Sequence, residues 1–102
     1  HAPQYAFRGL GMDLELLDWL NTNTFPEESK YRDLEYAKSA YGIFADSMRS
    51  SATTRACIFA TIHNQATKLL FIFLFSSEFR NKEAVCLMYS RKQLQISKCS
   101  CL

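Results

Sequence analysis

Glycine and proline are scarce in this sequence, and neither occurs in its second half. The three glycines are Gly9, Gly11 and Gly42, and the two prolines are Pro3 and Pro26. The sixty residues after Gly42 contain neither, although a compact chain of that length needs turns. The composition therefore changes character along the chain.

Long apolar runs and a strong excess of one charge are also missing. The longest apolar run, 69–75, has seven residues, whereas roughly 20 are needed to span a bilayer. The net charge of +2 is too small to indicate nucleic-acid binding. Apolar residues make up 48% and charged residues 22%, which argues against disorder. We expect a single small globular unit with neither a membrane nor a nucleic acid as partner.

No secretory signal is recognisable, because the N-terminal segment is polar and is broken by Pro3 and Gly9. Without a secretory context, disulfide pairing has no support. We therefore expect a cytoplasmic protein in which four cysteines stay reduced, namely Cys57, Cys86, Cys99 and Cys101.

The charge balance changes sign near residue 71. Residues 1–70 hold seven Lys and Arg against eight Asp and Glu, which gives −1. Residues 71–102 hold five against two, which gives +3. The composition therefore changes character near residue 71.

The first third of the chain predicts a loop followed by two short helices. Residues 1–11 are typical of a loop that leaves a strand. An amphipathic helix is expected over 13–20, with Asp13 as its cap. A second helix should start at 24–28, where a threonine, a proline and two glutamates follow one another. Trp19 and Phe25 are expected to be packing anchors.

The rest of the chain predicts helix, strand and helix. Apolar residues at helical spacing predict a long helix over 34–50, with Asp33 as its N-cap. Residues 53–62 are β-branched and apolar, which favours a strand buried on both faces. Asn64 could cap a following helix, and residues 82–95 could be helical. This order is α/β and implies a parallel sheet.

Three stretches carry a resemblance to a known family, and they are HAPQYAF (1–7), MDLELLDWL (12–20) and TTRACIFATIH (53–63). They resemble guanine deaminase, a zinc-dependent member of the amidohydrolase superfamily. The resemblance implies a fragment of a (β/α)8 TIM-type metal-dependent hydrolase barrel, from the end of strand one through helix two. It covers residues 1–70 as a partial barrel and leaves 71–102 as a frameshifted or divergent tail.

The resemblance also assigns roles to three residues. His1 corresponds to the second histidine of the His-x-His pair that ends the first barrel strand, where i and i+2 side chains share a face and bind one metal. Gln4, with His1, belongs to the segment that lines the purine pocket. His63 ends the second strand and would lie near the site, or be structural, without binding metal. Taken without the family, a lone histidine is weak support for a metal site and Gln4 is an ordinary loop residue.

The implied reaction is zinc-dependent hydrolysis of guanine to xanthine and ammonia in purine salvage. No catalytic residue of the family falls within this chain, so we expect the isolated chain to be inactive. The family implies a homodimer for the intact enzyme, and an open strand with an apolar run predicts self-association of the fragment. The alternative is a non-catalytic remnant or a small interaction module that uses the basic last third.

Overall fold

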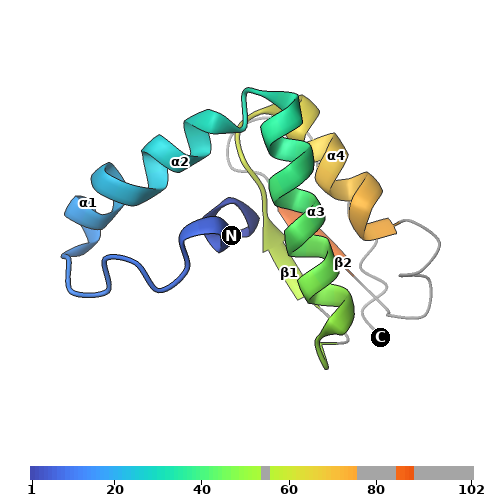
Figure 1. The fold of residues 1–102 in the computed structure, drawn as a ribbon, viewed down its shortest axis with the longest axis horizontal. Coiled ribbons are helices and arrows are strands. Elements are labelled where there is room, and N and C mark those ends of the chain that lie inside the picture. The colour runs from blue at the N-terminus through green and yellow to red at the C-terminus, as the bar shows by residue number, and fades with distance from the viewer. Residues whose placement is uncertain (54–55, 76–84, 89–102) are drawn as a thin grey trace.

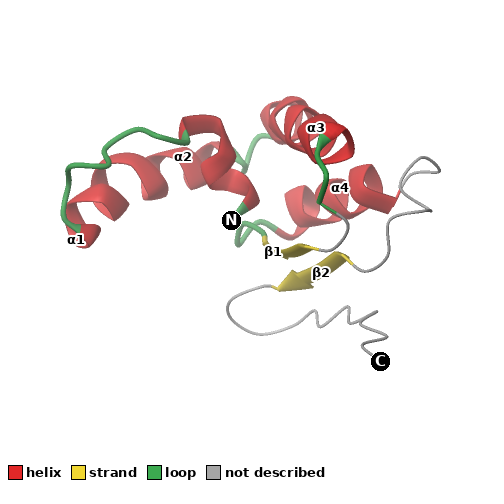
Figure 2. Cartoon of the chain, turned by 90° about the horizontal axis from the view of Figure 1, so that it is seen from below, coloured by secondary structure: helices red, strands yellow, loops and turns green. Residues whose placement is uncertain are grey.

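The computed structural model describes residues 1–53, 56–75 and 85–88. The chain forms two layers, in which the helices α3 (Leu34–Ser50) and α4 (Asn64–Phe75) cover one face of a pair of strands (Figure 2). The strands are β1 (Ala56–Phe59) and β2 (Val85–Met88). The helices α1 (Leu16–Trp19) and α2 (Phe25–Lys30) extend away from these layers on one side (Figure 1).

The two strands are parallel, as the sequence predicts. Ala56 is opposite Val85 and Phe59 is opposite Met88. Because parallel neighbours need a crossover connection, α4 lies between them in the chain and packs on one face. The result is a β-α-β unit whose second strand comes from the tail. A helix over 82–95 is therefore wrong for residues 85–88, where pairing with β1 favours extended backbone, and 82–84 and 89–95 lie outside the described residues.

The long helix α3 confirms its sequence prediction at both ends. Its N-cap is Asp33, whose carboxylate accepts a hydrogen bond from the amide of Glu35 at 2.9 Å. The apolar stripe is buried at Ala37, Tyr41 and Phe44, while Leu34 at its start is exposed. The stripe packs α3 against α4 and β1.

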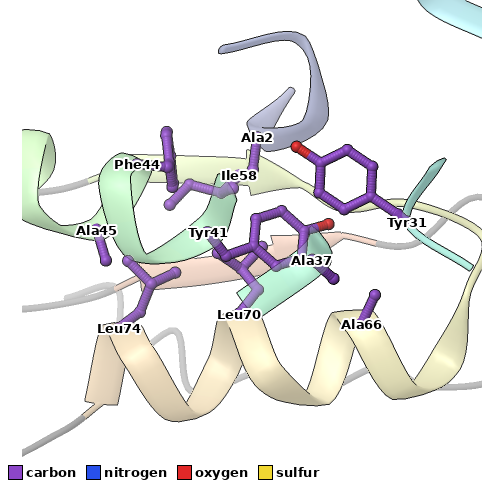
Figure 3. Packing of buried hydrophobic residues seen from close by; sticks show 10 residues of the cluster. All are labelled: Ala2, Tyr31, Ala37, Tyr41, Phe44, Ala45, Ile58, Ala66, Leu70 and Leu74. Atoms are coloured by element: carbon purple, nitrogen blue, oxygen red, sulfur yellow. The ribbon is translucent and has the colours of Figure 1, made fainter. Parts of the chain in front are cut away.

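The core lies between α3, α4 and β1 and also receives the N-terminal segment. Figure 3 shows Ile58 of β1 and Ala2 near the tyrosine rings of Tyr31 and Tyr41, with Leu70 on the α4 side. The members of this buried cluster are Ala2, Tyr31, Ala37, Tyr41, Phe44, Ala45, Ile58, Ala66, Leu70 and Leu74. The N-terminal segment is thus fixed by packing.

The predicted strand over 53–62 is shorter in the structure, with residues 54–55 outside the description. Only Ala56–Phe59 forms the ladder, because the pairing partner spans four residues. Burial on both faces is also wrong here, since Ile58 is buried on the helix side while Cys57 is exposed on the other. The free thiol of Cys57 agrees with the expected reduced state, and Cys99 and Cys101 lie outside the described residues.

The beginning of the chain differs more from expectation. Residues expected as a loop contain a 3₁₀ helix, Ala2–Phe7, which begins with Pro3 in its first turn. Gly9 and Gly11 then turn the chain with φ of +82° and +67°. A Cβ on Gly11 would lie 2.7 Å from the Asn23 side chain, so only glycine fits this turn.

The next two helices are continuous, and the first starts later than expected whereas the second starts where the sequence predicts. α2 begins at Phe25 after Thr24, with a proline and two glutamates in its first turn, but the Thr24 side chain makes no capping hydrogen bond. α1 begins at Leu16, with Glu15 and not Asp13 at its N-cap position, and a π-helical turn, Leu20–Thr24, joins it to α2. Of the expected apolar face, Leu14 and Leu17 are exposed, whereas Trp19 and Leu20 are half-buried. The helix expected around Asn64 is confirmed, with Asn64 as its first residue and not as its cap, and it runs on through the apolar 71–75.

Of the two expected packing anchors, one is confirmed. The indole of Trp19 is half-buried, packs on Phe7 at 5.6 Å between ring centroids, and donates its N–H to the Leu10 carbonyl at 3.0 Å. Phe25 is 56% exposed, so its role as an anchor is wrong for this chain.

Candidate functional site

A cavity of about 450 Å³ lies between the N-terminal segment, α3 and β1. His1 and Gln4 contribute to its lining from the N-terminal turn. Phe44 does so from α3, and Ala56 and Cys57 do so from β1. The structure therefore brings two of the three sequence-predicted site residues to one hollow.

His1 and Gln4 lie together because of the 3₁₀ helix between them. The amide of Gln4 donates to the His1 carbonyl at 3.2 Å. Residues three apart lie nearly above one another in such a helix, so both side chains are presented on the same side. A loop of the same length would leave their relative placement open.

The imidazole of His1 reaches the end of β1. It stacks on the Phe59 ring with the centroids 4.8 Å apart and the planes inclined by 17°. His1 is exposed overall and Phe59 is half-buried. The stacking fixes the ring plane of His1 while leaving the residue accessible to a ligand.

Buried contacts with α2 and α3 hold the turn that carries His1 and Gln4 in place. Ala2 and Pro3 are buried, and the Tyr31 hydroxyl donates to the Pro3 carbonyl at 3.5 Å. Tyr5 packs edge-on against Phe44 of α3 at 5.4 Å between centroids. These contacts hold the turn against α2 and α3.

His63 does not line this cavity. It lies four residues after β1 and immediately before α4, where its carbonyl accepts the Thr67 amide at 3.0 Å. His63 lines a second hollow of about 410 Å³ instead. The other residues that line it are Phe25, Glu28, Ser29, Arg32 and Ile62. In the structure His63 therefore lies beyond the end of β1 and beside residues of α2.

Glu28 in this second hollow was expected only to favour the start of a helix. Burial raises the pKa of its carboxyl, and the nearby His63 opposes that rise. No local sequence signal identifies Glu28, since it and His63 are 35 positions apart in the sequence.

The preceding glutamate has a structural role. Glu27 is buried, forms an ion pair with Lys30 at 2.7 Å and accepts the hydroxyl of Tyr36. Burial, with the hydrogen bond from Tyr36 to Glu27, raises the pKa of that tyrosine to about 12. Its two partners satisfy the Glu27 carboxylate within the fold, which leaves Glu28 as the carboxylate that faces a hollow.

The described residues do not complete a metal site by themselves. Among residues 1–53, 56–75 and 85–88 no group of three or more His, Cys, Asp or Glu side chains could hold a metal ion. A catalytic zinc needs three protein ligands and an open position. His1 can supply one imidazole, so further ligands would have to come from elsewhere. None of the helices in the described part is long and apolar enough to cross a membrane.

Several curated proteins are similar in sequence to about two-thirds of this chain. Guanine deaminase of Dictyostelium discoideum is 51% identical over 70 residues, which are 69% of this chain and 16% of that protein. The human guanine deaminase is 41% identical over 70 residues, 69% of this chain and 15% of its own length. The Escherichia coli guanine deaminase is 41% identical over 71 residues, 70% of this chain and 16% of its own.

The chain thus spans about 16% of the length of these curated relatives. No protein-family model matches the chain, and no solved structure matches it. The similarity is therefore one of sequence over a short segment.

Proposed function

We propose, from the premise that this chain carries a guanine deaminase segment, that residues 1–70 form the start of the catalytic barrel of such an enzyme. The observation that carries the proposal is 51% identity over 70 residues with the Dictyostelium discoideum guanine deaminase. The proposed reaction is the hydrolysis of guanine to xanthine and ammonia.

The proposed fold is part of a (β/α)8 barrel. In such barrels active sites lie at the carboxyl ends of the strands. The parallel β1 and β2 are joined through α4 in a β-α-β unit, an arrangement that such barrels repeat, although β2 comes from residues 71–102 and not from the matched segment. The His1 imidazole and the Phe59 ring at the end of β1 are stacked, which supports a site at this edge.

His1 is proposed as a zinc ligand and as part of the substrate pocket. Its exposed imidazole can donate one nitrogen to a metal while stacking on Phe59 holds the ring plane. When bound, zinc supplies a water whose pKa is lowered toward about 7, so that hydroxide is available at neutral pH. The remaining ligands and the proton-transfer groups would come from the part of the enzyme that this chain does not cover.

Gln4 is proposed to bind the guanine base. Its side-chain amide offers one acceptor and two donors, and the edge of a purine presents both kinds of group. Gln4 lines the same cavity as His1, so the amide can fix the orientation of a base beside the metal ligand. A site built from such hydrogen bonds rejects bases that lack the matching groups.

A second candidate is a non-catalytic module, and one observation favours it. The tail residues Val85–Met88 pair with β1, and residues 71–75 continue α4. These parts of residues 71–102 therefore pack within the fold, as they would in a self-contained small protein. In this candidate the positive charge of residues 71–102 would contribute to binding a partner.

Sequencing the source DNA across codon 70, with translation of every frame, separates the two candidates. The enzyme proposal expects a frame that continues into further strands with the remaining metal ligands, and a product that deaminates guanine. A reading frame that ends at Leu102 in the genomic DNA, with no guanine turnover by its product, would leave the binding module.

A further inference from the structure

Arg8 brings a permanent positive charge to the cavity that His1 and Gln4 line. It follows the 3₁₀ helix directly and forms part of the cavity wall. Among the described residues, no aspartate or glutamate lines this cavity. Because a cavity lined by charge of one sign attracts ligands of the opposite sign, this wall favours an anionic ligand.

The guanidinium of Arg8 is held in place by Tyr5. Its Cζ atom lies 4.1 Å from the centroid of the Tyr5 ring, and its Nη1 donates to the Tyr5 carbonyl at 3.0 Å. The Tyr5 ring in turn packs edge-on against Phe44 of α3. Since a guanidinium has five N–H donors in a planar fork, the hydrogen bond to Tyr5 leaves further donors that can reach a ligand.

No carboxylate of the described part of the chain forms an ion pair with Arg8. The ion pairs found there join Lys30 to Glu27 and Arg49 to Asp46. The cavity wall beside Arg8 is rich in aromatic side chains, which are Tyr5, Phe7, Trp19 and Phe44. An oriented arginine without a carboxylate partner, next to aromatic rings, fits a flat ligand that carries a negative charge.

We propose that Arg8 is an anion-binding residue of this cavity, and that it favours purines with a negative charge over neutral purines of similar size. The purine class of the ligand rests on the proposed function, whereas the preference for negative charge rests on the placement of Arg8. The charge can come from the ring, as in ionised xanthine, or from a phosphate, as in a purine nucleotide. In both cases guanidinium N–H groups donate to an anionic oxygen.

This preference has a consequence for the proposed reaction. Xanthine is a stronger acid than guanine, so the product carries negative charge at a lower pH than the substrate does. Arg8 therefore binds the product more tightly than the substrate, while the neutral amide of Gln4 does not distinguish their charge.

Nuclear magnetic resonance of the 15N-labelled 102-residue chain tests the charge preference without any turnover. Trp19 lines the cavity and is the single tryptophan, so its indole N–H resonance reports binding there. Two pairs of probes are titrated at pH 8, xanthine against hypoxanthine and guanosine 5′-monophosphate against guanosine. The first member of each pair is largely anionic at this pH and the second is largely neutral. In at least one pair the anionic member should bind about tenfold more tightly.

The matched variants are Arg8→Gln and Arg32→Gln, which remove the same charge from two exposed positions. Arg8→Gln should weaken binding of the anionic probe by about tenfold and leave the neutral probe unchanged. Arg32→Gln, in the second hollow, should change neither. Added salt should weaken only the anionic probe in the wild type, because ions screen an exposed charge. That measurement tests the preference even if Arg8→Gln fails to fold.

Dependence on Arg8 in the xanthine pair alone would assign the negative charge to the ring, and dependence in the nucleotide pair alone would assign it to the phosphate. Equal binding within both pairs, equal losses in Arg8→Gln and Arg32→Gln, or no binding of any probe would overturn the role of Arg8. Purine binding that ignores charge would overturn that role and still agree with the proposed pocket. The proposed reaction itself is tested separately, by guanine turnover.

Discussion

The imidazole of His1 lies flat on the ring of Phe59, with the centroids 4.8 Å apart and an angle of 17° between the planes. This stacking joins the first residue of the chain to the last residue of β1. It places the proposed metal ligand at the strand end, where Gln4 is its neighbour in the cavity.

Replacing Phe59 should release the ring of His1. In Phe59→Leu the apolar volume stays similar but the aromatic ring current is lost, so the His1 ring protons should move downfield in the proton spectrum. Phe25→Leu, which removes an exposed ring elsewhere, is the control. Identical His1 proton shifts in wild type and Phe59→Leu would contradict the stacking.

Loss of the Asp33 cap should destabilise α3. Asp33→Ala removes the acceptor for the Glu35 amide and should lower the free energy of unfolding by about 1 kcal/mol. Asp33→Asn keeps an acceptor and should change it little. Urea unfolding followed by circular dichroism measures both. Equal losses in the two variants would show that the charge, and not the cap, matters.

Tyr31 should matter through its ring more than through its hydroxyl. Tyr31→Phe loses only a long hydrogen bond to Pro3 and should cost less than about 1 kcal/mol. Tyr31→Ala leaves a cavity between the Tyr36 and Tyr41 rings and should cost about 3 kcal/mol or more. Thermal unfolding of the two variants distinguishes loss of the hydroxyl from loss of the ring. A Tyr31→Phe variant as unstable as Tyr31→Ala would contradict this expectation.

The half-buried carboxyl of Glu28 should make stability depend on pH. Because burial raises its pKa above the ordinary 4.5, the folded chain holds this proton more tightly than the unfolded chain. Stability due to Glu28 is therefore full below pH 4.5 and declines as pH rises through the folded-state pKa. Glu28→Gln should remove this decline and have the higher melting temperature at pH 7.

The matched control for that pH dependence is Glu15→Gln, an exposed carboxylate. Melting temperatures between pH 4 and 8 should separate the two variants, with the control following wild type. His63→Gln removes a side chain that lowers the pKa of Glu28. It should therefore raise that pKa further and extend the decline of stability to higher pH. A Glu28→Gln profile parallel to wild type would show that the carboxyl is not buried in solution.

Self-association should depend on the exposed side chains before and within α1. Leu16 and Leu17 are 68% and 72% exposed, Met12 lines a hollow together with Leu16, and exposed apolar side chains of this kind favour association. Light scattering after size exclusion should show species larger than 11.8 kDa, reduced in Leu16→Gln/Leu17→Gln. Ile43→Gln, an exposed position on α3, should not reduce them. A monomer at every concentration would contradict this expectation.

The sequence was most informative where local chemistry determines structure. The Asp33 cap and the apolar spacing after it predicted α3 correctly, and the apolar run after residue 53 predicted a parallel strand. These features depend on side chains close in sequence. The order helix, strand, helix followed from them.

Local sequence patterns did not predict the features that depend on contacts between residues far apart in the chain. The 3₁₀ helix at the start depends on Tyr31 and on burial of Ala2, and both are distant packing effects. The exposure of Leu16 and Leu17 could not be anticipated, because helical periodicity identifies an apolar face without showing what covers it. Glu28 was read as a helix-start residue for the same reason, since its approach to His63 is set only by the fold.

The most direct test of the guanine deaminase assignment is guanine turnover by the longest product of the source locus, with bound zinc measured in the same sample. The expected result is conversion of guanine to xanthine with release of ammonia, lost in the His1→Ala variant, and no turnover by the 102-residue chain alone. A zinc-loaded product that leaves guanine unchanged, or that keeps full turnover after His1→Ala, would contradict the assignment.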